Sequence, residues 1–371
     1  MYRFIIQFSR FSLFALIFAL VACNQNSEPL SSEKTDRSFD NKMDARSRVS
    51  LVEHAHHMVI ANRNSGSITV IDTRTERIRG TYDLPTGAQT PQPMYVVWVP
   101  HTNRVFVGDR SNDRVVVFNA DNYSVETTVE AGKGIFHMWA GKRGKQLWVN
   151  NDIDNTATII DPRTLEVLHT VPMPADLVAA GGKPHDVILE PKGDKAFVTM
   201  LGFAGEHDYV VRFNTNTYQE TGRRAVGKDP HLSLHPRNDL LYIPNQNTNE
   251  LIILNRSTMQ EVKNLAIPGA HGAGMDYKGQ VFLTTNLPGG GENGIYAVRL
   301  QNNEIIGSVD TPYPIPHNLA FNAAGDKVYL THSGGSSQKV TVYELNRRTQ
   351  ELNFHKEFNV GLNPFGLALA K

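Results

Sequence analysis

A short strand-like tetrapeptide recurs seven times along this chain of 371 residues. Most copies begin with an aromatic or β-branched residue, continue with an aliphatic one and end in small or polar residues. The copies are VIAN (59–62), FVGD (106–109), WVNN (148–151), FVTM (197–200), YIPN (242–245), FLTT (282–285) and YLTH (329–332). They lie roughly 40–50 residues apart, which is the spacing of four-stranded blades rather than of helical repeats.

Each copy is followed by a turn, a further apolar run and a more polar segment, and no stretch keeps a helical period. These runs predict an all-β fold, a seven-bladed β-propeller with four antiparallel strands per blade, over residues 51–371. The first repeat lacks its first strand, whereas the chain ends in an unpaired run, NPFGLALAK (363–371). We therefore expect the C-terminal strand to join blade one, which closes the ring and leaves no free sheet edge there.

These seven repeats resemble those of the YVTN-repeat seven-bladed β-propellers, which are named after a tetrapeptide that YIPN and VIAN approximate here. The resemblance covers about residues 52–371. It implies the fold strongly and the function weakly, because propellers of this shape include binding proteins, lactonases, lyases and metal enzymes.

The N-terminus has the pattern of a bacterial lipoprotein signal. Arg3 and Arg10 precede an apolar run that is about half the length needed to span a bilayer, and the run ends in LVAC with Cys23. This lipobox resemblance predicts a signal peptide over 1–22, lipidation of Cys23 and a polar, flexible tether over 23–50. Asn24 follows the cysteine instead of an inner-membrane retention aspartate. We therefore expect an outer-membrane lipoprotein in the bacterial envelope, facing the periplasm or the cell surface.

Composition excludes several chemistries. Cys23 is the single cysteine, so the domain can form no disulfide, cysteine-ligated zinc or iron–sulfur centre, or CxxCH haem site. Basic and acidic residues balance at 37 each, which gives no electrostatic reason to expect nucleic acid as a partner. The expected partners are the membrane, through the lipid, and a small-molecule, metal or protein ligand at one face of a monomeric propeller.

A histidine returns at the start of the first strand of successive repeats, as in GKPHDVILE (182–190). Aligning these strands places one residue of each blade at the same height around the central channel. The aligned residues are Met94, His137, His185, His231, His271, His317 and Phe365. Five consecutive histidines are thus expected to form an arc at the channel mouth.

Three interpretations of this arc remain open. The imidazoles can hydrogen-bond neighbouring backbone and join the blades, as buried histidines often do. They can instead hold a transition metal, with copper first, because Met94 offers a soft ligand, and zinc or iron next. They can also bind an anionic organic ligand.

The propeller domain of nitrous oxide reductase is distantly similar, and it holds copper through histidines from its blades. Here the adjacent pair His56-His57, with His54, lies before the second strand of blade one and not in a first strand. The cysteines needed for an electron-entry copper site are also missing. The resemblance therefore does not imply nitrous oxide reduction.

Loops between second and third strands should lie on the same face as the histidine arc. The longest of them bring further polar side chains to that face: Glu206, His207, Glu292, Asn293 and His332. Together with Met94 and Phe365, the residues Glu206, His207 and His332 are the expected ligand contacts. Asp186 follows His185 and, by strand alternation, is expected to point away from the channel and to be structural.

Three functional classes follow from these features. The first, which we favour, is an envelope-anchored binding protein whose histidine-lined channel takes a ligand, such as a metal ion or a metal-dependent substrate. The second is a copper- or other metal-dependent enzyme that uses the histidine arc. The third is a metal-independent, lactonase-like hydrolase or lyase, a class that carries no local sequence motif.

Overall fold

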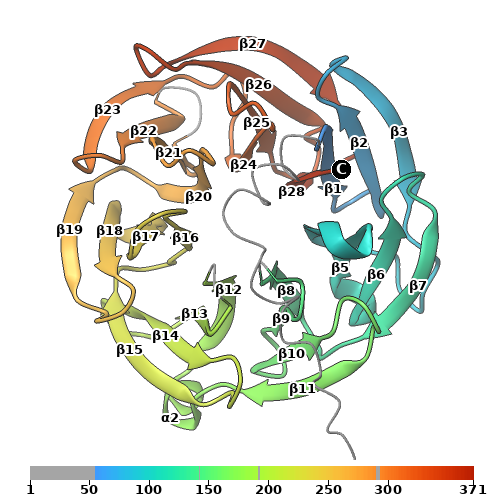
Figure 1. The fold of residues 1–371 in the computed structure, drawn as a ribbon, viewed down its shortest axis with the longest axis vertical. Helices are drawn as coiled ribbons and strands as arrows, with labels where there is room; N and C mark the ends of the chain where they lie inside the picture. The colour runs from blue at the N-terminus through green and yellow to red at the C-terminus, as the bar shows by residue number, and fades with distance from the viewer. Residues whose placement is uncertain (1–54, 142, 191–192, 290–292) are drawn as a thin grey trace, which may run out of the picture. The chain divides into compact units, whose positions relative to one another are not determined.

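The computed structural model describes residues 55–141, 143–190, 193–289 and 293–371. These residues lie in one compact unit, and their strands form seven four-stranded antiparallel sheets. The sheets are arranged around a common axis as the blades of a propeller (Figure 1). The predicted all-β, seven-bladed fold is confirmed. The predicted signal peptide (1–22), Cys23 and the tether (23–50) lie outside the described residues.

The strands of each blade follow one another from the axis outwards. Blade one consists of β28 (Pro364–Ala370), β1 (His57–Asn62), β2 (Ser67–Asp72) and β3 (Arg77–Asp83), from innermost to outermost. Blade two consists of β4 (Pro93–Val99), β5 (Arg104–Asp109), β6 (Arg114–Asn119) and β7 (Val125–Glu130). Blade three consists of β8 (Ile135–Ala140), β9 (Leu147–Asn151), β10 (Thr156–Ile160) and β11 (Val167–Pro172).

The remaining blades have the same order. Blade four consists of β12 (Lys183–Leu189), β13 (Lys195–Leu201), β14 (Asp208–Asn214) and β15 (Glu220–Val226). Blade five consists of β16 (Ser233–Leu234), β17 (Leu240–Asn245), β18 (Glu250–Asn255) and β19 (Glu261–Ala266). Blade six consists of β20 (Ala270–Met275), β21 (Val281–Asn286), β22 (Ile295–Arg299) and β23 (Glu304–Val309). Blade seven consists of β24 (Pro316–Phe321), β25 (Lys327–His332), β26 (Lys339–Asn346) and β27 (Glu351–Asn359).

Helical structure is confined to connections. The described elements are α2 (Ala175–Ala179) and the 3-10 turns η1 (Pro100–Thr102), η2 (Arg110–Asn112) and η3 (Gln246–Thr248). No helix in the described ranges has the length and apolar character needed to cross a bilayer.

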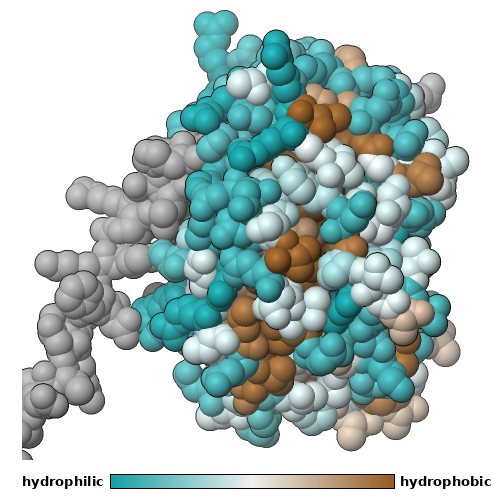
Figure 2. Space-filling view, turned by 90° about the vertical axis from the view of Figure 1, so that its right-hand side faces the viewer, coloured by the Kyte–Doolittle hydropathy of each residue, from teal (hydrophilic) through white to brown (hydrophobic). Residues whose placement is uncertain are grey.

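Burial explains why the second strand carries the sequence signal. Every residue of β1 and of β21 is buried, because each blade is covered on both faces by its neighbours. The outermost strands, such as β3 and β7, are largely exposed. Apolar side chains on them, including Ile78 and Val125, are interspersed with polar ones, and the rim beside these two strands is mainly hydrophilic (Figure 2).

The ring is closed as the sequence predicts. Strand β28 pairs antiparallel with β1, so the C-terminal strand is the innermost strand of blade one. Buried side chains of blades seven and one, including Tyr329 and Met58, form a shared apolar cluster across this seam. At the periphery Glu76 of blade one accepts from Lys327 of blade seven and lies 2.9 Å from His355 Nε2. Packing and charge together hold the first and last blades in contact.

Candidate functional site

A β-bulge shapes the start of the innermost strands. In blade four Pro184 pairs with Met200 and Val187 pairs with Val198. The two pairs are three residues apart along β12 but only two residues apart along β13. The same shift recurs in blades one, two, three, six and seven. In blade five Pro230 pairs with Asn245 and Ser233 with Tyr242, so the register there does not shift. In the other six blades one extra residue of the inner strand is therefore left outside the ladder. We define the top face as the face of the ring on which these strands begin.

The bulge corrects the predicted register in two blades. In blade three Ile135 pairs with Asn151, so Phe136 holds the position of His185, and His137 is one residue further along. In blade six the tetrapeptide in register is 283–286 and not 282–285, because Ala270 pairs with Asn286. The residues at equivalent positions are Met94, Phe136, His185, His231, His271, His317 and Phe365. Four blades, not five, carry histidine there.

The side chains at these positions nearly form a closed ring around the axis. Their successive ring-centroid distances, from Phe136 through the four histidines to Phe365, are 4.6, 4.9, 3.9, 4.9 and 4.1 Å. Phe365 and Phe136 lie 6.2 Å apart and complete the circuit. Met94, Tyr95 and Phe365, with Phe136 against them, make one side of this ring apolar. The other side is made of imidazoles.

Threonine hydroxyls join neighbouring blades at this level. Thr285 accepts from Gly272 N in its own blade and donates to His317 O in the next blade. Thr331 likewise accepts from Asn318 N and donates to Phe365 O. Both threonines stand at the third position of the in-register tetrapeptide. In blades six and seven the threonine thereby satisfies backbone groups that the bulge frees.

His137 is held by Asp186. Its Nδ1 lies 2.9 Å from Asp186 Oδ1, and Asp186 also accepts from Leu232 N at 2.9 Å and Val187 N at 2.7 Å. Burial raises the pKa of Asp186 to about 6, so this carboxyl is ionised at neutral pH. Burial lowers the pKa of His137 well below its usual value. A neutral His137 therefore donates from Nδ1 and directs the lone pair of Nε2 towards the axis.

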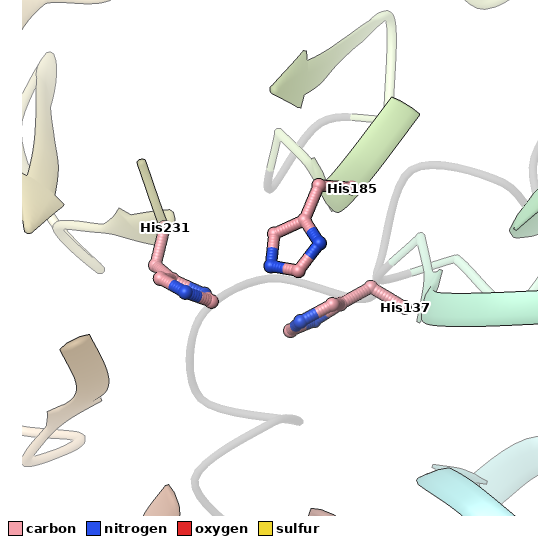
Figure 3. Close-up of side chains that lie close together, drawn as sticks. All are labelled: His137, His185 and His231. Atoms are coloured by element: carbon pink, nitrogen blue, oxygen red, sulfur yellow. The ribbon is translucent and has the colours of Figure 1, made fainter. Parts of the chain in front are cut away.

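Several imidazole nitrogens near the axis have no hydrogen-bond partner among the described residues. They are His137 Nε2, His185 Nε2, His231 Nε2 and both ring nitrogens of His271. The three side chains of His137, His185 and His231 converge (Figure 3), and each offers a ligand atom within 4.8 Å of the other two. Leaving a buried polar atom unpaired costs about 1–3 kcal/mol, so this convergence requires a physical reason.

Asp229 adds a carboxylate to the same cluster. It lies in the loop between β15 and β16, and its Oδ1 is 3.9 Å from both His185 Nε2 and His231 Nε2. Asp229, His231 and His271 form a second set of ligand atoms within 4.8 Å of one another. The backbone of Asp229 has φ +58°, in the left-handed region, and its N–H donates to Asp208 Oδ2. The loop thus holds Asp229 in an unfavourable conformation that places its carboxylate beside the histidines.

Burial also sets the charge state of the cluster. It lowers the pKa of His231 to about 4 and that of His317 to about 3, and it lowers those of His185 and His271 well below the usual value. It raises the pKa of Asp229 to about 6, helped by the nearby charge of Asp208. At neutral pH the site therefore combines neutral imidazoles with ionised carboxylates, the protonation state in which these groups bind metal.

The other predicted residues lie apart from this cluster or inside the fold. Met94 and Phe365 belong to the apolar side of the axis, whereas Glu206 and His207 are exposed on the β13–β14 loop. His332 is fully buried, and its ring contacts Thr341 Oγ1 at 2.8 Å and Pro314 O at 3.3 Å. Neither of its ring nitrogens is open to a ligand. Cys23, His54 and Glu292 lie outside the described residues.

Of the histidine pair His56-His57, His57 is the first residue of β1 and is committed to the fold. His57 is buried, with Nδ1 2.9 Å from Tyr123 Oη and Nε2 2.8 Å from Arg79 Nη1. Both of its nitrogens are therefore occupied. This leaves no open ligand atom on His57.

Comparison with known proteins fixes the family. Residues 20–266 match the family described as lactonase, 7-bladed beta-propeller, which is more than half of the chain. The chain belongs to this family. Two curated relatives of this lactonase-family propeller are named Protein NirF. The match is 29% identical over 83 residues in Stutzerimonas stutzeri and 28% identical over 119 residues in Pseudomonas aeruginosa.

The likeness to these relatives is local. The matched segments cover 22% and 32% of the lactonase-family propeller, and only 21% and 27% of the length of the two NirF proteins. Solved structures resemble it over more of the chain. The periplasmic gluconolactonase of P. aeruginosa has a TM-score of 0.66 at 14% identity, covering 85% of this chain and 99% of its own. Hydrazine synthase of Kuenenia stuttgartiensis has a TM-score of 0.65 at 13% identity, covering 81% and 92%. Such low identity establishes the shared fold alone.

Proposed function

We propose that this lactonase-family propeller binds one transition-metal ion at its axis and presents it to a small ligand on the top face. His137, His185 and His231 would supply Nε2 atoms, with Asp229 beside them. The observation that carries this proposal is the convergence of buried imidazole nitrogens that have no hydrogen-bond partner among the described residues.

The donor set fits such an ion. Three neutral imidazoles suit zinc, iron or copper(II) and leave a position for ligand or water, provided that Asp229 stays beside the ion without binding it or that the ion takes more than four ligands. Ligand nitrogens in a tetrahedral zinc site lie about 3.4 Å apart, so rings already within 4.8 Å need only small rotations. The Asp186–His137 contact matches the carboxylate support that metal-bound histidines usually have. Met94 packs on the apolar side of the axis, which weakens the sequence-based preference for copper.

Metal content tests the proposal directly. The purified protein is loaded separately with zinc, iron, copper and nickel, desalted and measured by inductively coupled plasma mass spectrometry. We expect about one equivalent of metal in the wild type and a clear loss in His137→Gln, His185→Gln and His231→Gln. His207→Gln is the matched control, because this exposed histidine lies outside the cluster. Wild type without retained metal, or equal retention in all variants, contradicts the proposal.

A second candidate function is metal-independent lactone hydrolysis. Family membership favours it, and the Asp186–His137 pair supports it. Neutral His137 Nε2 would accept a proton from water as the resulting hydroxide adds to the lactone carbonyl carbon. The ring C–O bond then breaks, and its alkoxide oxygen takes up the proton held on His137 Nε2, which restores the neutral imidazole and leaves a hydroxy acid. Hydrolysis of sugar lactones by chelator-treated protein, lost in His137→Gln, would favour this function over the metal site.

We also propose that the protein is a lipoprotein of the bacterial envelope. The LVAC sequence ending at Cys23, after a basic and apolar segment, supports this location. Labelled palmitate should be incorporated into the wild type and not into Cys23→Ser. Incorporation into the variant, or none into the wild type, would refute the anchor.

A further inference from the structure

Arg63 lies beside the apolar side of the axis. It is the first residue after β1, and this position at the end of a second strand is on the top face. Its guanidinium carbon is 5.1 Å from the centroid of the Phe365 ring. The Phe365 ring is in turn 4.1 Å from that of His317. A positive charge therefore stands next to the histidine ring, on the far side of Phe365.

The guanidinium of Arg63 is half-buried, yet it makes no hydrogen bond or ion pair with any residue in the described ranges. Burial and the nearby charge of Arg110 lower its pKa below the ordinary value. A cation–π contact with Phe365 compensates part of the lost hydration, and the described residues take up none of the five N–H donors. Such a group is suited to a planar or tetrahedral oxyanion.

Arg110 shows what a compensated arginine looks like at the same place. It is the first residue after β5, and its guanidinium carbon is 5.4 Å from the Phe136 ring. Unlike Arg63, it pairs with Asp152 at 2.9 Å and donates to two backbone carbonyls of the next blade. Arg110 is therefore committed to joining blades two and three, whereas Arg63 remains available.

We propose that Arg63 anchors the carboxylate or phosphate group of a small anionic ligand, whose body lies over Phe365 towards the histidines. Two parallel N–H···O bonds from the guanidinium would fix the orientation of the anion. Phe365 and Tyr95 would contact apolar parts of the same molecule. The role of this subsite rests on the proposed function, because it would place an anionic ligand beside the metal. Anion binding by Arg63 itself does not require the metal.

Anion binding is measured by isothermal titration calorimetry with benzoate and, separately, with inorganic phosphate. Each titration uses chelator-treated and metal-loaded protein. The variants are Arg63→Gln, which removes the charge, and Arg63→Lys, which keeps it without the planar fork. Arg74→Gln is the matched control, because Arg74 is an exposed arginine in the β2–β3 turn, away from the top face.

We expect chelator-treated wild type and Arg74→Gln to bind at least one of the two anions. Affinity should fall at least tenfold in Arg63→Gln and less in Arg63→Lys, while the metal content of both stays at the wild-type level. Preference for benzoate would identify a carboxylate ligand, and preference for phosphate a phosphorylated one. Absence of binding to wild type, or equal binding by wild type and Arg63→Gln, would overturn the subsite. Anion binding that occurs only in metal-loaded protein and has the same affinity in wild type and Arg63→Gln would overturn the subsite as well.

Discussion

Replacing Asp186 with asparagine tests the link between the fold and the metal site. The change keeps the size of the side chain and removes its charge. Asp186 accepts three hydrogen bonds, from His137 Nδ1 and Val187 N at Oδ1 and from Leu232 N at Oδ2. Asparagine has one acceptor oxygen, so both orientations of its amide leave a conflict.

The two orientations have different consequences. If the amide oxygen takes the place of Oδ1, the NH₂ group faces Leu232 N–H, and a buried donor loses its partner. If it takes the place of Oδ2, the NH₂ group faces both Val187 N–H, which loses its acceptor, and His137, which must accept at Nδ1 and carry its proton on Nε2. The first case costs about 1–3 kcal/mol of folding free energy. The second removes the lone pair on His137 that would bind the metal, and losing such carboxylate support typically weakens metal affinity about 10–100-fold.

Two measurements on Asp186→Asn check this reasoning. Urea unfolding followed by tryptophan fluorescence gives the stability, and competition with a chromophoric chelator gives the metal affinity. Asp83→Asn is the control, because this aspartate is exposed on β3. We expect Asp186→Asn to lose stability, metal affinity or both, and the control to keep both. If metal affinity and stability both match wild type, Asp186 does not orient His137.

Three further predictions concern the fold around the site. Burial lowers the pKa of His332 to about 4. The stabilisation of the folded state that comes from keeping this imidazole neutral, up to about 3 kcal/mol, is therefore complete above pH 6.5 and is lost as pH falls towards 4. The channel histidines act in the same direction, whereas Asp186 and Asp229, with pKa values raised to about 6, oppose them by gaining stability as pH falls. Urea midpoints at pH 7 and pH 4.5 should therefore show a net loss at the lower pH, and an unchanged midpoint would refute it. Thr331→Val removes two buried hydrogen bonds and should lower stability by about 2–4 kcal/mol in urea unfolding, whereas a wild-type midpoint would show that the hydroxyl does not join the blades. Gly272→Ala would place a methyl group 2.0 Å from a backbone oxygen of blade seven, so we expect little soluble folded protein by size-exclusion chromatography, and normal folding would contradict the close approach.

The fold could be predicted from sequence because the burial of the second strand of each blade determines which residues that strand can contain. A strand covered on both faces must be apolar or β-branched along its whole length, and seven such strands at regular spacing leave few alternatives. The closing strand could be predicted as well, since 363–371 had no partner in its own repeat. The predicted register of the innermost strand was less accurate. A bulge changes backbone pairing without a characteristic residue, so His137 was aligned where Phe136 stands.

The candidate site was predicted only in part. The recurring histidines indicated the right axis, but nothing in the sequence showed that threonine hydroxyls would take over the blade-to-blade bonds. Asp186 was expected to be structural, and it does accept from two backbone N–H groups; it also contacts His137 of the neighbouring blade. Asp229 was missed, although an aspartate two residues before the recurring histidine, and directly before proline, was a usable signal. His332 belongs to a buried strand end, which its place in the tetrapeptide already indicated.

Closure of the ring by β28 has a consequence for how the polypeptide matures. Ala370 pairs with His57, so almost the whole described chain must be made before blade one is complete. Contacts this distant in sequence form slowly, and until they form β1 presents an unpaired edge that can associate with other strands. Products that lack the last seven-residue strand cannot hide this edge. Pairing of β28 is therefore the step that removes the exposed edge of β1 and with it the risk of association through that edge.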